Sequence, residues 1–333
     1  MSLEEVAKRA KVSTATVSRV LNNVDVVKHS TRVRVMKAVQ ELKYHPNLHA
    51  RSLAGGKNRT IGMIVSNMEN PFFFDIFRAV EADAHAAGYE VVTANTNYRP
   101  EQLVTSIRLM IGRRVAGLLA VVSEMDTGLT QDLADSEIPV VFYDVGAPRP
   151  NITNIRVNYR KGIQKVVEYL YTLGHRRMAF IGHDTTLGPI SDRRAAFEEA
   201  VRVLSAVEFR TVADADSLEG GRLAARDLLN SGFQPTAIIC VNDFMAVGVL
   251  RELRERGIRV PQDVSVTGFD NIKLSEFCCP ALTTVHIPRE RIGHIAFESL
   301  VPEFRRSPLS GREIQIDPEF IIRESTGAAQ ESA

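Results

Sequence analysis

One short segment near the N-terminus carries side chains that could read DNA. Its apolar residues Val17, Val20 and Leu21 share one face of a predicted helix that begins after Ser13. Short polar or small side chains and one arginine point the other way: Thr14, Ala15, Ser18, Arg19 and Asn22. An arginine presented in this way can donate two parallel hydrogen bonds to guanine, which discriminates between bases by about 1–3 kcal/mol. We therefore predict that Arg19 reads a base, with a solvated surface arginine as the alternative.

The charge distribution also points to DNA binding at one end of the chain. Residues 1–57 carry 11 Lys and Arg against 4 Asp and Glu, a net charge of +7. The remaining residues carry 30 against 36, a net charge of −6. A small basic segment joined to a mildly acidic body is typical of a protein that binds nucleic acid at one end. The alternative is a basic helix pair that is merely solvated.

Three short helices are predicted to position these residues. Ser2 and Glu5 have the spacing of a capping box at the first helix, and Ser13 can cap the second. A third helix is predicted over 31–43, before Pro46. The stretch 47–57 is a marginal helix that is too short to be stable alone.

From Thr60 onward, apolar strands alternate with amphipathic helices. Continuous apolar strands joined by helices favour parallel sheets covered on both faces, so the predicted class is α/β. The strands come in two series, which predicts two similar lobes with a ligand-binding cleft at the strand ends. The predicted strands are 61–65, 89–94, 117–122, 139–144, 177–182, 208–212, 237–241 and 264–269.

Several classes of protein are disfavoured. The first residues form no apolar secretory segment, and no apolar run is long enough to cross a membrane. Cys240, Cys278 and Cys279 form no metal or disulfide pattern, which fits a reducing cytoplasm. His45 and His49 lack a third ligand nearby, so no metal is expected. No hydrolase, zinc-protease or nucleotide-binding motif is present, so we expect neither an enzyme nor a cofactor.

Long ordered blocks of the sequence resemble the lactose/galactose repressor (LacI/GalR) family of transcriptional regulators. This resemblance implies an N-terminal helix-turn-helix domain and a two-lobed core similar to periplasmic sugar-binding proteins, with three crossings between the lobes. The blocks are EVAKRAKVSTATVSRVLN, YHPNLHARSLAGGKNRTIGMIVSNMENPFF, LGHRRMAFIG, SDRRAAF, VNDFMAVG, VPQDVSVTGFDN and PALTTVHIP.

The resemblance also implies domain boundaries. We expect a DNA-binding domain over 1–46, a hinge helix and linker over 47–59, an effector-binding core over 60–326 and a tail over 327–333. Within the core, lobe one should comprise about 60–156 and 286–315. Lobe two should comprise about 157–285 and 316–326.

The family pattern extends the list of predicted DNA contacts. Ser13, Thr16, Asn22 and Thr31 would hold phosphates, while Thr14 and Ala15 occupy positions at which the family varies its operator choice. In the hinge, Asn47 is a further predicted contact, and Leu53 matches the leucine that family members wedge into the minor groove. Lys28 departs from the family because a small capping residue is usual there. We therefore expect the third helix to start near Ser30.

Effector contacts are implied at loops that follow strands. Asp and Arg side chains in a cleft suit the vicinal hydroxyls of a sugar, polyol or nucleoside. Asp243 could instead simply cap its helix. Ala196 replaces a family glycine, and Ala215 stands where purine-binding relatives place an aromatic residue, so a carbohydrate is favoured. The implied contacts are Asn70, Phe72, Phe73, Ser123, Asp144, Arg193, Asn242, Asp243 and Asp270.

The sequence thus predicts a cytoplasmic, ligand-responsive transcriptional repressor. It would bind pseudo-palindromic operator DNA as a homodimer, because the segment after Ile322 has no heptad pattern that could form a tetramer. A purine- or nucleoside-responsive regulator, a periplasmic-type sugar-binding protein and a regulator that senses a partner protein are the alternatives.

Overall fold

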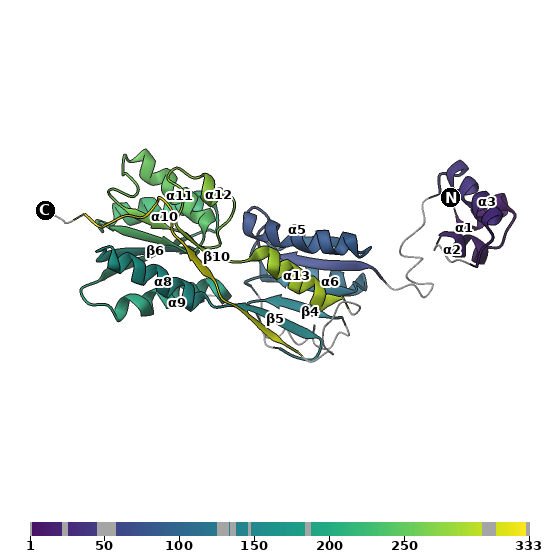
Figure 1. Ribbon diagram of the computed structural model, residues 1–333, viewed down its shortest axis with the longest axis horizontal. Coiled ribbons are helices and arrows are strands. Elements are labelled where there is room, and N and C mark those ends of the chain that lie inside the picture. The colour runs from purple at the N-terminus through teal and green to yellow at the C-terminus, as the bar shows by residue number, and fades with distance from the viewer. Residues whose placement is uncertain are drawn as a thin grey trace. The chain divides into compact units, whose positions relative to one another are not determined.

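The computed structural model describes residues 2–21, 26–44, 58–124, 133, 138–145, 148–183, 188–301 and 311–330. The chain forms two compact units, residues 1–58 and 59–333. We call the helices of the first unit the head and the second unit the core, and each is described by itself (Figure 1).

The head consists of three helices packed around a small apolar core. The predicted capping box is present, because Glu5 N donates to Ser2 Oγ at 3.2 Å and Ser2 N donates to Glu5 Oε2 at 2.7 Å. The helices are α1 (Leu3–Ala10), α2 (Thr14–Leu21) and α3 (His29–Glu41). Their buried core consists of Val6, Ala7, Ala10, Val17, Val20, Val35 and Ala38.

The start of α3 differs from the prediction. The helix begins at His29 rather than near Ser30, and Lys28 is its N-cap residue without a side-chain hydrogen bond. The Lys28 carbonyl accepts hydrogen bonds from Thr31 N and Arg32 N, each at 3.0 Å. These main-chain bonds start the helix, so no capping side chain is needed.

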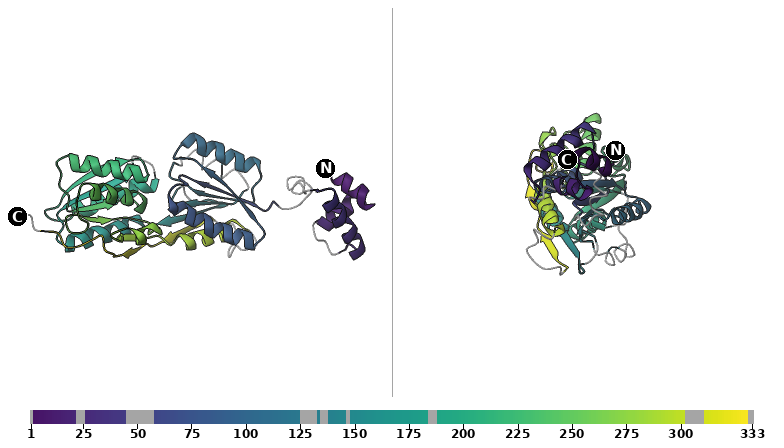
Figure 2. Two further views of the ribbon diagram at one scale, coloured as in Figure 1. Left: turned by 90° about the horizontal axis from the view of Figure 1, so that it is seen from above. Right: turned by 90° about the vertical axis from the view of Figure 1, so that its right-hand side faces the viewer.

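Lobe one of the core contains a six-stranded parallel sheet in the order β11-β5-β4-β3-β1-β2. Alternate residues of its strands face opposite sides: Met63 packs with α5 and α13, whereas Ile64 packs with α6. Figure 2 shows helices above and below this sheet. The strands are β1 (Thr60–Val65), β2 (Glu90–Asn95), β3 (Gly117–Val121), β4 (Val140–Tyr143), β5 (Ile152–Val157) and β11 (Glu313–Ile316), and the helices are α5 (Pro71–Ala86), α6 (Pro100–Gly112) and α13 (Arg289–Leu300).

Lobe two contains a four-stranded parallel sheet in the order β7-β6-β8-β9. Helices α8 and α9 pack against each other, as do α10 and α11, so two helix pairs cover the sheet. The strands are β6 (Arg177–His183), β7 (Glu208–Asp214), β8 (Ala237–Cys240) and β9 (Ser265–Thr267). The helices are α8 (Tyr159–Thr172), α9 (Gly188–Arg202), α10 (Leu218–Asn230), α11 (Asp243–Glu255) and α12 (Leu274–Phe277).

Three described segments of the chain connect the two lobes. The first joins β5 to α8, the second joins β10 (Thr284–His286) to α13, and the third joins β11 to β12 (Glu319–Ile321). Strands β10 and β12 pair antiparallel beside these crossings. The predicted two-lobed α/β fold class is confirmed, while the predicted boundary residues of head, hinge and lobes stay predictions.

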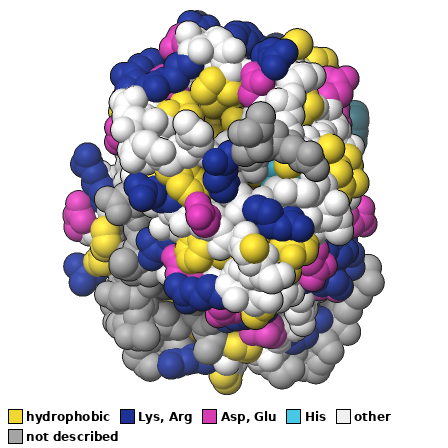
Figure 3. Space-filling view, turned by 90° about the vertical axis from the view of Figure 1, so that its left-hand side faces the viewer, with side chains coloured by type: hydrophobic (Ala, Val, Ile, Leu, Met, Phe, Trp, Pro, Cys, Tyr) yellow, Lys and Arg dark blue, Asp and Glu magenta, His cyan; other side chains and the backbone are white. Residues whose placement is uncertain are grey.

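The surface of lobe two that faces away from lobe one carries charges of both signs. Figure 3 shows basic and acidic side chains interspersed over this face, with scattered apolar ones. Such a mixture does not form the continuous basic patch that DNA binding needs. None of the helices in the described ranges is long and apolar enough to span a membrane.

Candidate functional site

The outer face of α2 presents most of the predicted DNA contacts of the head. Ser13, Thr14, Ala15 and Arg19 are exposed, and the residues facing inward are the buried Val17 and Val20. Thr16, Ser18 and Thr31 are partly exposed. This arrangement leaves a helix surface of polar and small side chains around one arginine, which can enter a DNA groove.

Two of these residues also hold the start of α2. Thr16 N donates to Ser13 Oγ at 3.2 Å, and the two hydroxyls lie 2.9 Å apart. A phosphate contact from either hydroxyl would therefore have to share an oxygen with this cap. The other predicted contacts, Asn22, Asn47 and Leu53, lie outside the described residues, as do His45 and His49.

The core contains a cavity between its two lobes with a volume of about 430 Å³, including the part open to solvent. Seven of the nine predicted effector contacts line it: Asn70, Phe72, Phe73, Ser123, Arg193, Asn242 and Asp270. The other lining residues are Tyr98, Val121, Val122, Tyr143, Tyr159, Ile190 and Asp216.

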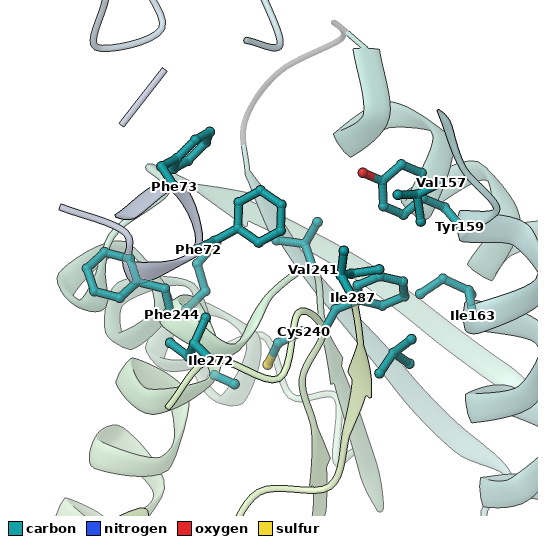
Figure 4. Packing of buried hydrophobic residues seen from close by; sticks show 14 of the residues in the cluster. Phe72, Phe73, Val157, Tyr159, Ile163, Cys240, Val241, Phe244, Ile272 and Ile287 are labelled. Atoms are coloured by element: carbon teal, nitrogen blue, oxygen red, sulfur yellow. The ribbon is translucent and has the colours of Figure 1, made fainter. Parts of the chain in front are cut away.

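The wall from lobe one is largely aromatic and is built on the start of α5. Asn70 is the N-cap residue, and its Oδ1 accepts a hydrogen bond from Phe72 N at 3.0 Å. The rings of Phe72 and Phe73 lie edge to face with centroids 5.3 Å apart (Figure 4). Phe72 also lies against Tyr143, with centroids 5.7 Å apart. A rigid helix start therefore holds an apolar surface toward the cavity.

Ser123 completes this wall at the end of β3. Its main-chain nitrogen donates to Ser66 Oγ at 3.1 Å and to Glu124 Oε2 at 3.0 Å. Glu124 is buried and also accepts from Ser66 Oγ at 2.6 Å and from Thr96 Oγ1. The carboxylate of Glu124 thus fixes the strand end that presents Ser123.

The wall from lobe two carries a buried arginine and a buried carboxylate. Arg193 Nη1 donates to the Val241 carbonyl at 2.7 Å and lies 3.9 Å from Asp270 Oδ1. The guanidinium stacks over Tyr159 and Phe269, at 4.3 Å and 4.9 Å from the ring centroids. Within the described ranges, Arg193 Nε and Asp270 Oδ1 have no hydrogen-bond partner. Leaving such buried atoms unsatisfied costs about 1–3 kcal/mol each, so a polar ligand that reached them would recover this free energy.

The electrostatics of this pair follow from its burial. Burial raises the pKa of Asp270 to about 7, although the positive charges of Arg193 and Arg289 work in the opposite direction. Burial also disfavours the charge of Arg193, but Tyr159 and Asp270 more than offset that and keep its pKa above the ordinary value. Arg193 is thus a fixed cation beside a carboxyl group that can change protonation near neutral pH.

The structure places Asp144 behind the cavity wall rather than on it. Its Oδ1 accepts from Val157 N at 2.6 Å, and its Oδ2 accepts from the Tyr159 hydroxyl at 2.5 Å. Burial raises the pKa of Asp144 to about 7, and these hydrogen bonds partly offset that effect. Asp144 does not meet the cavity directly as expected; it orients Tyr159, which does.

Asp243 also lies away from the cavity. It is fully buried, and its two oxygens accept from Thr284 Oγ1 at 2.5 Å and from Ile272 N at 2.8 Å. Burial raises its pKa to about 8. The cap of α11 is Asn242, whose Oδ1 accepts from Met245 N at 2.8 Å, so Asp243 is not the helix cap either. The cap interpretation was wrong, because the side chain of Asp243 turns toward the 272 and 284 segments, and its role as an effector contact stays a prediction.

Asp216 was not predicted, and neither were its partners Tyr98 and Asn67. Ala215 does not line the cavity; the next residue, Asp216, does. Asp216 Oδ1 accepts from Asn242 Nδ2 at 2.7 Å, its Oδ2 accepts from the Tyr98 hydroxyl, and its carbonyl accepts from Asn67 Nδ2 at 3.0 Å. Asn67 and Tyr98 belong to lobe one, so these bonds cross the cavity. The available signal was position: Asp216 lies between β7 and the α10 cap Ser217.

The arrangement suits ligand binding rather than metal binding. In the described part of the chain, no group of three or more His, Cys, Asp or Glu side chains could hold a metal ion. The cavity instead combines aromatic walls with a few converging polar groups, which is the usual composition of a small-molecule site.

Comparisons with known proteins agree with both halves of this description. Residues 2–47 match the model for bacterial regulatory proteins of the lacI family, and residues 167–326 match that for a periplasmic binding protein-like domain. The HTH-type transcriptional repressor PurR of Vibrio atlanticus (strain LGP32) is 34% identical over 330 residues, which cover 97% of each chain. The chain belongs to the LacI family. PurR of Vibrio parahaemolyticus serotype O3:K6 is 36% identical over 331 residues, covering 97% of each chain.

Solved structures of LacI-family members share the fold over almost the whole chain. A Lac repressor dimer bound to operator and the anti-inducer ONPF matches with a TM-score of 0.84 and 28% identity, covering 98% of this chain and 99% of that one. The complex of the transcriptional regulator CelR with cellobiose matches with a TM-score of 0.69 and 27% identity over the same shares. The predicted family and the predicted transcriptional repressor are confirmed, because the PurR relatives and the Lac repressor are repressors by name.

Proposed function

We propose that this LacI-family repressor binds pseudo-palindromic operator DNA as a homodimer and that a carbohydrate in the cavity between the lobes changes its affinity for DNA. The observation that carries the carbohydrate proposal is the pair of unsatisfied atoms Arg193 Nε and Asp270 Oδ1 on one wall. The relatives support the rest, because one solved Lac repressor is a dimer on its operator.

The chemistry of this pair fits adjacent hydroxyl groups. A hydroxyl both donates and accepts hydrogen bonds, so one hydroxyl can accept from Arg193 while its neighbour donates to Asp270. Bonds to charged groups contribute about 1.5–3 kcal/mol each, more than bonds between neutral groups. The aromatic wall of Phe72 and Phe73 offers an apolar surface for the C–H face of a sugar ring. One structural relative is a complex with cellobiose, a sugar.

A purine or nucleoside is the second candidate. Several of the relatives are transcriptional repressors named PurR, and the aromatic side chains that line the cavity of this chain could stack on a base. Asp216 adds a hydrogen-bonded carboxylate to the polar groups of the cavity, and such groups suit hydroxyl groups better than the apolar faces of a base. The carbohydrate therefore remains the proposal.

On the DNA side, the proposed base reader is Arg19, with Thr14, Ala15 and Ser18 beside it on α2. Ser13, Thr16 and Thr31 would contact phosphates. The support for these roles is the exposed outer face of α2 and the match of residues 2–47 to the family model. Asn22, Asn47 and the proposed minor-groove wedge Leu53 keep their predicted roles as part of this proposal.

A panel of ligands tests the effector proposal. The panel contains glucose, ribose, cellobiose, xylitol, glucose 6-phosphate, guanosine and hypoxanthine, and the readout is the melting temperature of the core transition. A ligand present at 100 times its Kd should stabilise the protein by about 2.7 kcal/mol. We expect at least one sugar or polyol to raise the melting temperature.

Two variants give the panel its control. Asp270→Asn should abolish the sugar-dependent rise, because it removes the charged acceptor. Asp83→Asn should leave the rise intact, because Asp83 pairs with His294 at 2.6 Å within lobe one, away from the cavity. A response to hypoxanthine or guanosine alone would replace the carbohydrate by the purine candidate, and no response to any compound would contradict both.

A further inference from the structure

Arg289 is a buried arginine that no predicted role explains. It is the first residue of α13, and only 9% of its side chain is exposed. Its Nε donates to Asp75 Oδ2 at 3.0 Å, and its Nη2 donates to the Asn271 carbonyl at 2.7 Å. Its Nη1 donates to the carbonyls of Asp270 and, at 3.1 Å, Ile287. All three guanidinium nitrogens are thus used.

The two ends of this set of bonds lie in different lobes. Asp75 is on α5 of lobe one, the helix that begins with the cavity residues Phe72 and Phe73. Asp270 and Asn271 follow β9 of lobe two, and Asp270 lines the cavity. Arg289 therefore connects the two walls of the effector cavity directly.

The turn that Arg289 holds is strained. Asp270 has a φ of 103° and Asn271 a φ of 55°, both in the left-handed region. Such residues cost on the order of 1–3 kcal/mol each and persist only when their surroundings hold them. Here Arg289 holds the two carbonyls, and Arg323 Nη2 holds Asn271 Oδ1 at 2.7 Å. Arg289 is therefore one of the groups that hold Asp270 at the cavity, together with the main-chain bond from Asp270 N to the Val285 carbonyl at 2.8 Å.

Stabilisation of α13 does not account for Arg289. A positive charge in the first turn of a helix opposes the helix dipole, whose positive end lies there. Pro288, the N-cap residue, has no side-chain capping bond that would compensate. The negative charge that offsets Arg289 comes instead from Asp75 on the neighbouring helix. The position of this arginine fits a role between the lobes better than a role within α13.

We propose that Arg289 is a positioning residue that transmits ligand contact at Asp270 to helix α5 through Asp75. A ligand that binds Asp270 shifts the strained 270–271 turn, the turn displaces the guanidinium, and Asp75 moves the start of α5. The inference rests on the proposed effector site, because it takes Asp270 as the group that the ligand touches. Coupling of this kind needs a contiguous set of interactions and a measured coupling energy, and the contacts above supply the first.

A double-mutant cycle without ligand measures the coupling energy between Asp270 and Asp75. Operator affinity is measured for the wild type, Asp270→Asn, Asp75→Asn and the double variant, on duplex DNA selected from a random pool with the wild type. We expect Asp270→Asn to change operator affinity about fivefold, within the range typical of coupled sites. In the Asp75→Asn background the same substitution should change it less than about twofold, because the connection is already broken.

The matched control is Asp83→Asn, which breaks the contact between Asp83 on the same helix and His294 without touching lobe two. In that background Asp270→Asn should keep its fivefold effect. Arg289→Lys keeps the charge beside Asp75 but cannot hold both carbonyls, so it should behave as Asp75→Asn does. Unfolding of each variant in urea, and hydrogen exchange over the first turns of α5, separate loss of coupling from loss of stability.

Three results would overturn the proposal. The first is that Asp270→Asn does not change operator affinity. The second is that the effects of Asp270→Asn and Asp75→Asn on operator affinity are additive. The third is that Asp83→Asn reduces the effect of Asp270→Asn as much as Asp75→Asn does. Because the cycle uses no ligand, a failed sugar panel leaves it intact. Conversely, an additive cycle leaves sugar binding at Asp270 untouched.

Discussion

Arg19 of the head and Arg193 of the core are the same side chain in opposite surroundings. Arg19 is exposed on the outer face of α2, and no described residue is seen to hold its guanidinium. Arg193 is buried, bonded to the Val241 carbonyl, stacked on two rings and placed beside Asp270. The first can adapt to a DNA surface, whereas the second is set in place before its partner arrives.

This difference separates two ways of recognising a ligand. An exposed arginine loses its freedom only on binding, so its substitution should affect affinity but not folding. A preorganised arginine has already lost that freedom during folding, and its neighbours depend on its charge. Substitution of Arg19 should therefore lower affinity for DNA, whereas substitution of Arg193 should lower the stability of the core.

The largest effect is expected for Arg193→Met. Removal of the guanidinium leaves the Asp270 carboxylate buried without its neighbouring cation, which costs about 3–5 kcal/mol when a buried pair is broken. The free energy of unfolding of the core, measured in urea, should fall by an amount of this order. A loss below about 1 kcal/mol would show that the stability of the core does not depend on the positive charge of Arg193 beside Asp270.

The pH dependence of stability should show the burial of Asp270. Its pKa is about 7 in the folded protein, above the ordinary 3.8, so the folded state keeps a proton that the unfolded state has released. Stability from this group is therefore present at low pH and is lost as the pH rises from about 4 through 7. His175 and His286 act in the opposite sense, because burial lowers the pKa of both.

The difference between the wild type and Asp270→Asn isolates this group. Urea unfolding of both proteins at pH 5 and pH 8 should show that the wild type loses stability relative to the variant by more than about 1 kcal/mol. If the free energy of unfolding changed equally between pH 5 and pH 8 in the two proteins, Asp270 would not titrate in this range.

Arg19→Ala should act on DNA alone. Loss of one bidentate base contact should weaken operator binding by about 1–3 kcal/mol, or roughly 5- to 150-fold, and relax the preference at one base pair. Electrophoretic mobility shifts with single-base operator variants measure both. The melting temperature of the head should stay within 2 °C of the wild type, so a clear loss of stability would contradict the comparison with Arg193.

The smallest effect is expected at the helix starts of the head. Ser2→Ala removes the cap of α1 and should destabilise the head by about 1 kcal/mol. Ser30→Ala is the matched control: α3 starts with Lys28 as N-cap residue, so Ser30 is not a cap. Each substitution is made singly in the full chain, and thermal unfolding is followed by circular dichroism. Only Ser2→Ala should lower the melting temperature of the head.

The sequence predicted correctly those elements whose structure depends on local periodicity. The capping box at Ser2, the inward Val17 and Val20, and the alternation of strands and helices all depend on residues within a few positions of one another. The outer face of α2, including Arg19, followed from the same periodicity. In the head, α3 begins one residue before the expected Ser30, because main-chain bonds replaced the missing capping side chain. In the core, the strands β5, β10, β11 and β12 were not predicted.

The cavity was less predictable because three similar carboxylates follow strands. Asp144, Asp243 and Asp270 look alike in sequence, yet only Asp270 faces the cavity. Asp243 turns toward Thr284, 41 residues away, and Asp144 turns toward Tyr159. These choices depend on contacts between segments distant in the chain. Asp216 was missed by one residue for the same reason: its role depends on Tyr98, 118 residues away.

The central claim is that a carbohydrate at Asp270 controls DNA binding. The most direct test measures operator affinity of the wild type and Asp270→Asn with and without the panel sugar that gives the largest rise in melting temperature. We expect this sugar to change the affinity of the wild type by about 5- to 150-fold and that of Asp270→Asn by less than twofold. An equal response of the two proteins to the sugar would contradict the claim.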